Sequence, residues 1–211
     1  MTSYPGLLRG TTTIGVVCRD GVVLSTDTRA TMGYFVAHKK AKKLYKIDDH
    51  LAITIAGAVA DAQRVVDILS AYANIYKLTH GRPMPVSAAA RFVANILSEN
   101  RRAPLLASTI VAGVDDEGPR IFQIDPFGSL TAEKCVSTGS GSPIAYGVLE
   151  DGYREDATVK EMLPVVVNAV SSAMKRDIAS GDDFDVAMIT REGYRELTRE
   201  EKEALLKRGR E

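Results

Sequence analysis

The sequence has little with which to form disulfides or to bind a metal ion. Two cysteines, Cys18 and Cys135, occur among 211 residues, and both lie in apolar, strand-like runs. This pattern favours reduced thiols in the core of a cytosolic protein over a disulfide framework. Two cysteines cannot hold zinc without further ligands, and His38, His50 and His80 show no ligand spacing. We therefore expect no metal site.

The sequence also lacks an excess of charge and a long apolar run. Basic and acidic residues number 27 each, so no overall charge favours binding to nucleic acid or to a membrane. No apolar run reaches the roughly 18 residues that a membrane-spanning helix needs. The beginning of the chain has only Leu7 and Leu8 as an apolar centre, without a basic segment, which is not typical of a signal peptide. We expect a soluble cytoplasmic protein.

The order of predicted elements favours an α+β fold in a single domain without internal repeats. Turns at Asp20-Gly21 and at residues 48–50 predict two β-hairpins, and apolar residues at three- and four-residue steps predict helices. Residues 28–40 are predicted to form a loop. The predicted strands cover residues 13–18, 22–27, 44–47, 51–56, 107–114, 120–125, 130–136 and 185–190. The predicted helices cover residues 58–80, 86–100, a short segment after residue 143, residues 158–179 and a charged, solvated stretch from residue 199.

This order is compatible with two arrangements of layers. Two antiparallel sheets, each with a pair of helices on its outer face, would form a four-layer αββα sandwich. A three-layer α+β domain is the alternative that the packing of helices against sheets leaves open.

The strongest candidate for chemistry is the stretch Gly-Thr-Thr-Thr-Ile-Gly from Gly10 to Gly15. A threonine hydroxyl needs a base to accept its proton, and cleavage of the Gly10–Thr11 bond would give Thr11 a free α-amine. The ordinary pKa of such an amine, about 8, suits a general base near neutral pH. One residue would then supply both the nucleophile and the base. The structural alternative is that consecutive threonines simply favour a strand.

Such a nucleophile needs a cation, a carboxylate that holds the cation, and an N–H donor for the oxyanion. Asp27 ends the strand that pairs with the Thr11 strand, so a tight hairpin brings both residues to one end. A lysine of the basic cluster after the loop could place its ammonium beside them, and the spacing does not distinguish Lys42 from Lys43. Gly57, at a strand-to-helix junction, could donate its N–H. Alternatively, the lysines form a solvated patch and Gly57 serves helix–strand packing.

Other hydrolase and nucleotide-binding motifs are incomplete. The Gly-Ser-Gly-Ser loop at residues 139–142 lacks the lysine of a P-loop and the third glycine of a dinucleotide fingerprint. No Gly-x-Ser-x-Gly motif is present, so we do not expect a Ser–His–Asp hydrolase.

Several motifs in unbroken order resemble those of proteasome β-subunits, which are threonine peptidases of the N-terminal nucleophile class. The resemblance covers essentially the whole chain after a short leader and is closest to archaeal β-subunits. Several motifs at matching intervals are far more specific than any one of them. The motifs are Gly10 to Gly15, Asp27, Arg29, His38 to Leu44, Thr54 to Gly57, Asp61 to Gln63, Ser137 to Pro143, Tyr146-Gly147 and Arg176 to Gly181.

The resemblance implies an N-terminal nucleophile hydrolase fold and a division of the chain. Residues 1–10 would be a propeptide, removed by autocatalytic cleavage between Gly10 and Thr11, and residues 11–211 would be a single peptidase domain. The reaction would be peptide-bond hydrolysis through an acyl-ester on Thr11, without a metal or an organic cofactor.

The resemblance also implies a role for each candidate residue. Lys43, not Lys42, would be the buried cation held by Asp27. The residues expected to orient the Thr11 amine and the water that carries its proton are Ser140, Asp177 and Ser180. Gly57 N–H would be the oxyanion donor, and Arg29 would support the site. The residues expected to line the primary substrate pocket are Ala30, Ala41, Ile55 and Val59. All four are apolar, so cleavage after large hydrophobic residues is expected.

The partners implied by the resemblance are other subunits and unfolded polypeptides. Two seven-membered β rings would lie between two α rings, closed by side-to-side interfaces, and an ATPase cap would feed unfolded chains to the sites. One alternative is a ring subunit that assembles without maturing and acts as a scaffold or regulator. Another is a different N-terminal nucleophile hydrolase, either a bacterial peptidase with six-membered rings or a small-molecule amidase.

Overall fold

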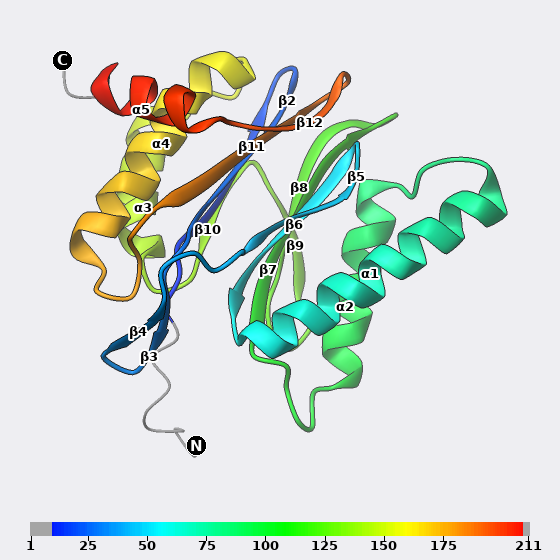
Figure 1. Ribbon diagram of the computed structural model, residues 1–211. Helices are drawn as coiled ribbons and strands as arrows, with labels where there is room; N and C mark the ends of the chain where they lie inside the picture. Colours follow the sequence, from blue (N-terminus) through cyan, green and yellow to red (C-terminus); the bar gives the residue numbers. More distant parts are fainter. Residues whose placement is uncertain (1–9, 209–211) are drawn as a thin grey trace.

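The computed structural model describes residues 10–208 (Figure 1). The strands are β1 Thr13–Cys18, β2 Gly21–Asp27, β3 Ala30–Met32, β4 Phe35–His38, β5 Leu44–Asp48, β6 Leu51–Gly57, β7 Ala107–Asp115, β8 Gly118–Ile124, β9 Leu130–Glu133, β10 Cys135–Thr138, β11 Phe184–Thr190 and β12 Gly193–Glu196. The helices are α1 Val59–His80, α2 Val86–Glu99, α3 Ser142–Gly152, α4 Val159–Arg176 and α5 Arg199–Arg208. Residues 1–9, most of the predicted propeptide, lie outside the described residues, as do residues 209–211.

Two five-stranded antiparallel sheets form the centre of the molecule. The first has the strand order β10-β1-β2-β11-β12, and the second has the order β5-β6-β7-β8-β9. Within residues 10–208, the two strands of a short hairpin, β3–β4, pair with each other and with neither of the two sheets. The predicted turn at Asp20 joins β1 and β2 in direct register, with Thr13 opposite Thr26. This register brings the beginning of β1 and the end of β2 to the same edge of the sandwich.

Three apolar cores hold the layers together. Successive side chains of a strand point to opposite faces of its sheet, so side chains on both faces are buried when both faces are covered. In β1, Ile14 and Val16 pack toward α3 and α4, whereas Val17 packs between the sheets. A further core joins the second sheet to α1 and α2. Figure 1 shows the two helix pairs on opposite sides of the paired sheets. The four-layer αββα prediction is therefore confirmed, and the three-layer alternative is excluded.

Two predictions about strands are wrong, and one strand was not predicted. The predicted loop at residues 28–40 contains β3 and β4, which are short and turn at Gly33 with a φ of 61°. The predicted strand at 130–136 is two strands, since β9 pairs with β8 in the second sheet and β10 pairs with β1 in the first. The chain changes sheets at Lys134. β12 is not predicted at all.

The two C-terminal helices also differ from the prediction. α4 begins with the predicted capping box, in which Thr158 and Glu161 exchange hydrogen bonds, but it ends at Arg176 rather than near residue 179. α5 is not fully solvated, because Lys202 is buried and its Nζ donates a 2.6 Å hydrogen bond to the Phe184 carbonyl oxygen. Within residues 10–208, none of the helices combines the length and the apolar character that a membrane crossing requires.

Candidate active site

Thr11 lies directly before β1, at the edge where β1 pairs with both β2 and β10. The residue is almost completely buried, with 4% of its surface exposed. Its hydroxyl donates a hydrogen bond of 2.6 Å to the Gly10 carbonyl oxygen, and its N–H lies 3.3 Å from Ser140 Oγ. In the full-length chain this nitrogen belongs to an amide. The α-amine predicted to act as the base therefore forms only when the Gly10–Thr11 bond is broken.

Asp27 ends β2 beneath Thr11 and is completely buried. Its Oδ1 accepts hydrogen bonds from the Thr12 amide at 2.9 Å and from Lys43 Nζ at 2.7 Å. Its Oδ2 accepts from the amides of Arg29 and Gly181, each at 3.0 Å. Four donors thus surround one carboxylate, which satisfies the charge in the absence of water.

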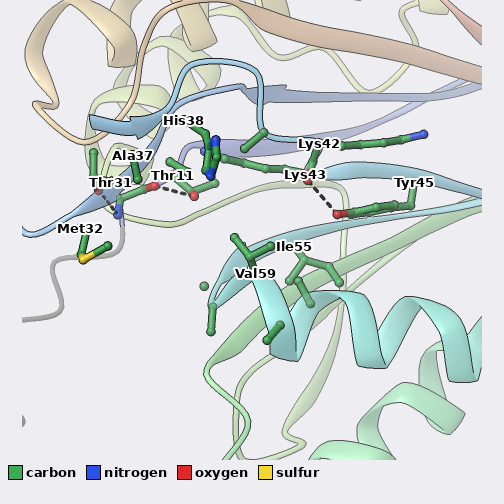
Figure 2. Close-up of a pocket in the computed structure, with 17 residues that line it drawn as sticks. Thr11, Thr31, Met32, Ala37, His38, Lys42, Lys43, Tyr45, Ile55 and Val59 are labelled. Carbon is green, nitrogen blue, oxygen red and sulfur yellow. Dashed lines mark hydrogen bonds between the residues drawn. The ribbon is translucent and has the colours of Figure 1, made fainter. Parts of the chain in front are cut away.

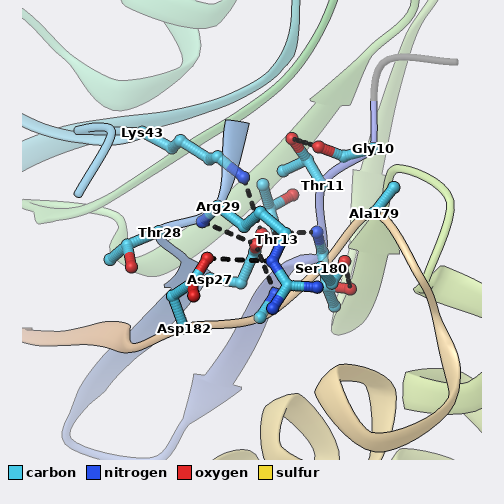
Figure 3. A network of polar contacts seen from close by, with 12 residues as sticks. Gly10, Thr11, Thr13, Asp27, Thr28, Arg29, Lys43, Ala179, Ser180 and Asp182 are labelled. Atoms are coloured by element: carbon cyan, nitrogen blue, oxygen red, sulfur yellow. Dashed lines mark hydrogen bonds and ion pairs between the residues drawn. The ribbon is translucent and has the colours of Figure 1, made fainter. Parts of the chain in front are cut away.

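Lys43 precedes β5 and brings a positive charge from the second sheet to Asp27. Figure 3 shows its side chain directed toward the space between Asp27 and Thr11. Burial lowers the pKa of Lys43 below its ordinary value of 10.5, and the Asp27 carboxylate opposes this shift. Lys42, the other lysine that the spacing left open, is exposed, and its Nζ lies 5.7 Å from the centre of the Tyr45 ring.

A second carboxylate, Asp177, joins three hydroxyls beside the Thr11 nitrogen. Its Oδ2 accepts from Ser140 Oγ at 2.5 Å and from Ser180 Oγ at 2.6 Å. Ser180 Oγ in turn lies 2.7 Å from Thr12 Oγ1. The network therefore links residues before β1, after β10 and after α4. Thr12 belongs to it, although the sequence analysis does not identify Thr12.

Two local features place this network. The early end of α4 leaves Asp177 as the C-cap residue, in extended backbone, so that its side chain turns toward Ser140. On the other side, Gly139 has a φ of 92°, and a Cβ atom there would lie 2.0 Å from the Thr11 carbonyl oxygen. Only glycine lets this loop approach Thr11 so closely.

Arg29 lies behind Asp27 and connects it to the segment after α4. Its side chain donates to Asp182 Oδ2 at 2.9 Å (Figure 3). It also donates to the Ile178 carbonyl oxygen at 3.0 Å. The hydrogen bond to Asp182 raises the pKa of Arg29. Arg29 thus holds the segment that carries Ser180, and its backbone N–H holds Asp27.

Gly57 ends β6 and faces the same pocket as Thr11. Its φ is 146°, and a Cβ atom would lie 1.8 Å from the Leu106 carbonyl oxygen. The next residue, Ala58, donates its N–H to that oxygen at 2.8 Å. The sharp change of direction from β6 into α1 therefore requires glycine at this position.

A pocket of about 470 Å³ opens beside Thr11, between the β3–β4 hairpin and the start of α1 (Figure 2). Its lining includes all four residues predicted to form it, Ala30, Ala41, Ile55 and Val59. Most of the lining is apolar. In Figure 2, Thr11 and Lys43 lie along one side of the pocket, and Ile55 and Val59 lie along the other.

Three larger residues of this pocket were not predicted from the sequence: Met32, His38 and Tyr45. Met32 and His38 belong to the β3–β4 hairpin, which was predicted as a loop. Tyr45 lies two residues after Lys43, and the two-residue period of a strand could have indicated that both reach the same side.

Outside this constellation, other reactive groups have little support. Among residues 10–208, no group of three or more histidine, cysteine or acidic side chains is placed to hold a metal ion. Both cysteines are free thiols, and burial raises the pKa of Cys18 and of Cys135 to about 12. Neither thiol is therefore activated as a nucleophile near neutral pH. The candidate nucleophile with a cation and an ordered proton network beside it is Thr11.

Known proteins resemble this chain over nearly its full length. A family model described as "Proteasome subunit" matches residues 7–189. The "Proteasome subunit beta" of Methanosarcina mazei is 48% identical over 195 residues, which cover 92% of this chain and 93% of the relative. That of Ferroglobus placidus is 49% identical over 203 residues, covering 96% and 97%. The "Proteasome subunit beta 2" of Nitrosopumilus maritimus is 46% identical over 200 residues, covering 95% of each. The chain belongs to the proteasome subunit family, as a β-subunit of the archaeal type and a threonine endopeptidase of the 20S core.

Proposed function

We propose that Thr11 is the nucleophile of this endopeptidase and that its first substrate is its own leader, residues 1–10. The observation that carries the proposal is the position of Thr11 Oγ1, 2.6 Å from the Gly10 carbonyl oxygen and at the wall of an apolar pocket. The hydroxyl is thus already beside the carbonyl group that it would attack, which is the positioning that intramolecular reactions exploit.

Self-cleavage begins with attack of Thr11 Oγ1 on the Gly10 carbonyl carbon. The bond from this carbon to the Thr11 nitrogen breaks, an ester to Oγ1 forms, and the hydroxyl proton ends on the nitrogen. Water then hydrolyses the ester. The leader leaves with a carboxylate on Gly10, and residues 11–211 remain as the peptidase domain with a free amine and hydroxyl on Thr11.

In the mature site, the Thr11 amine accepts the proton of Oγ1 as the hydroxyl attacks a substrate carbonyl. The positive charge of Lys43, held by Asp27, favours the deprotonated forms of both groups on Thr11. Ser140, tied to Asp177, lies 3.3 Å from the Thr11 nitrogen and orients it. General base catalysis of this kind contributes about 10²–10⁴-fold to the rate.

Two further features support turnover of peptides. Gly57 lines the pocket, and its N–H is the proposed donor to the oxyanion, a contribution of about 10²–10³-fold for a single donor in other enzymes. The apolar lining that includes Ile55 and Val59 accepts the side chain before the scissile bond, so cleavage after large hydrophobic residues is favoured.

The proposed setting is a cytoplasmic particle in which this chain forms seven-membered β rings between α rings, with an ATPase cap that delivers unfolded polypeptides. Membership of the proteasome subunit family supports this assembly. Confinement in such a particle would restrict an otherwise permissive pocket to unfolded substrates.

The proposed roles are tested by comparing two nearby lysines in particles assembled with α-subunits. Lys43→Met removes the buried cation, and Lys40→Met, at an exposed position outside the pocket lining, is the matched control. Hydrolysis of a fluorogenic peptide with leucine before the scissile bond should fall about 10²-fold or more in the first variant and stay near the unmodified rate in the second. Equal losses in both variants would contradict the assignment. Peptides with glutamate in place of leucine should be poor substrates throughout.

A further inference from the structure

We infer that Ala179 is a positioning residue for self-cleavage, because its side chain forms the wall that restricts the residue before Thr11 to glycine. The inference rests on the proposed self-cleavage of the Gly10–Thr11 bond. It concerns the acyl transfer described above, in which that bond breaks as the ester to Thr11 Oγ1 forms.

Gly10 is held at three points. Its N–H lies 3.3 Å from Thr31 Oγ1, and its carbonyl oxygen accepts the hydrogen bond from the Thr11 hydroxyl. Its Cα lies against Ala179, so closely that a Cβ atom on residue 10 would come within 1.6 Å of the Ala179 Cβ. Figure 3 shows Ala179 beside Gly10. Real Cβ atoms do not approach other atoms to such distances, so any other residue must move the carbonyl away from Thr11.

The contact that restricts residue 10 is steric, and it comes from one neighbouring segment. The Ala179 Cα and carbonyl carbon would lie 2.6 Å and 2.8 Å from the added Cβ, so removal of the Ala179 methyl group relieves the worst contact and leaves lesser ones.

The segment around Ala179 is fixed by the network that serves Thr11. The Ala179 N–H donates to Asp177 Oδ1 at 3.3 Å, and the next residue, Ser180, bonds to Asp177 Oδ2 at 2.6 Å. Arg29 binds the Ile178 carbonyl oxygen. Ala179 is 5% exposed. A larger residue 10 could be accommodated only if the segment around Ala179 moved, and this movement would disturb the hydrogen bonds of Asp177 and Ser180. The alignment of the leader and the proton network therefore depend on the same loop.

The direction of this contact separates the leader from ordinary substrates. Gly10 itself borders the pocket that contains Ile55 and Val59, but a side chain on residue 10 would point at Ala179, which is not part of the described lining. Residue 10 therefore does not occupy the pocket as the residue before a substrate's scissile bond would. Self-cleavage accepts only the smallest residue, whereas the same nucleophile later accepts large ones.

The test follows leader removal over time by intact mass, in particles assembled from full-length chains and α-subunits. Gly10→Ala should slow leader removal at least 100-fold. In the double variant, Gly10→Ala with Ala179→Gly, the leader should be removed at least tenfold faster than in Gly10→Ala alone. Ala179→Val, with the native Gly10, should also slow leader removal, because its larger side chain extends the wall toward residue 10.

The outcomes separate this inference from the proposed function. Suppose that the unmodified chain and Ala179→Gly both lose the leader normally. If the double variant then loses it no faster than Gly10→Ala, Ala179 does not set the requirement for glycine. Leader removal at the unmodified rate in Ala179→Val would also overturn the inference. If the unmodified chain itself keeps its leader, the failure lies with the proposed self-cleavage.

Discussion

Asp27 and Lys43 place opposite charges, 2.7 Å apart, where water has almost no access. Removing two charges from water is costly, and their attraction offsets this only when the remaining hydrogen-bonding capacity is also satisfied. The carboxylate meets that condition, since the amides of Thr12, Arg29 and Gly181 complete its shell. Removing one charge alone should therefore destabilise the fold more than replacing both.

This expectation is tested with Asp27→Asn, Lys43→Met and the double variant. Asp27→Asn leaves a buried ammonium without its partner and should lower the free energy of unfolding by about 3 kcal/mol or more. Lys43→Met leaves a carboxylate that still accepts three N–H groups, so its loss should be smaller. The double variant should lose less than the sum of the single ones. Chemical denaturation of the chain expressed alone measures all three, and strictly additive losses would count against a coupled pair.

Asp185, in β11, provides a pH-dependent test at the same scale. Burial raises the pKa of Asp185 above its ordinary value of 3.8, Lys202 opposes the shift, and Glu196 and Asp183 add to it. The folded state thus binds this proton more tightly than the unfolded state does. The stabilising contribution of the proton is complete below pH 3.8 and is lost as the pH rises through the raised pKa.

Asp185→Asn removes this titration and should make the chain more stable than the unmodified one at pH 7. The difference should shrink as the pH falls toward 4, because the carboxyl of the folded, unmodified chain takes up its proton as the pH passes through the raised pKa. Urea denaturation at the two pH values gives the comparison. A variant that is less stable at pH 7, or whose advantage grows in acid, would be inconsistent with a raised pKa.

At the scale of elements, the junction between β6 and α1 sets the position of Gly57. Its φ of 146° and the close Leu106 carbonyl oxygen leave no room for a side chain. Gly57→Ala should therefore lower the free energy of unfolding by about 3 kcal/mol, from backbone strain and overpacking together. Activity should fall as well, because the N–H donor moves.

Gly147, inside α3, is the matched control for this substitution. A Cβ atom there would meet nothing within 4 Å, so Gly147→Ala should be neutral or raise stability by up to about 1 kcal/mol. Thermal unfolding and peptide hydrolysis of both variants decide the matter. Similar changes in stability and hydrolysis in the two variants would contradict a specific requirement for glycine at the junction between β6 and α1.

Elements with local signals could be predicted from the sequence, and those decided by distant pairing could not. The Asp20-Gly21 turn fixes β1–β2, and the capping box at Thr158 fixes the start of α4. In contrast, one alternating run at residues 130–136 divides between two sheets, because β8 and β1 compete as partners. The short β3–β4 hairpin carries no periodic signal, and the pocket residues on it were missed with it.

The same distinction applies to the candidate site. A hairpin in register was enough to bring Thr11 and Asp27 to one edge. The choice of Lys43 over Lys42, and the placing of Ser140, Asp177 and Ser180 near Thr11, came from resemblance, since their partners lie far along the chain. Ala179 acts through a contact that no residue pattern expresses, because it depends on the distance between two backbones.

At the scale of the whole molecule, the site exists only where the two sheets meet. Thr11 and Asp27 belong to the first sheet, whereas Lys43 and Gly57 come from the second, whose backbone fixes Lys43 through a 3.0 Å hydrogen bond from the Ile55 N–H. The core between the sheets therefore holds the cation against the carboxylate. Nucleophile and cation are brought together only when the sandwich is complete.

The most direct test of the account is the intact mass of this chain after assembly with α-subunits. We expect the unmodified chain to lose residues 1–10, which leaves Thr11 at the amino terminus, and Thr11→Ala to keep the leader. Retention by the lone chain followed by removal in particles would mean that assembly completes the site. A leader retained by the unmodified chain in fully assembled particles would contradict the account and favour a structural β-ring subunit that never matures.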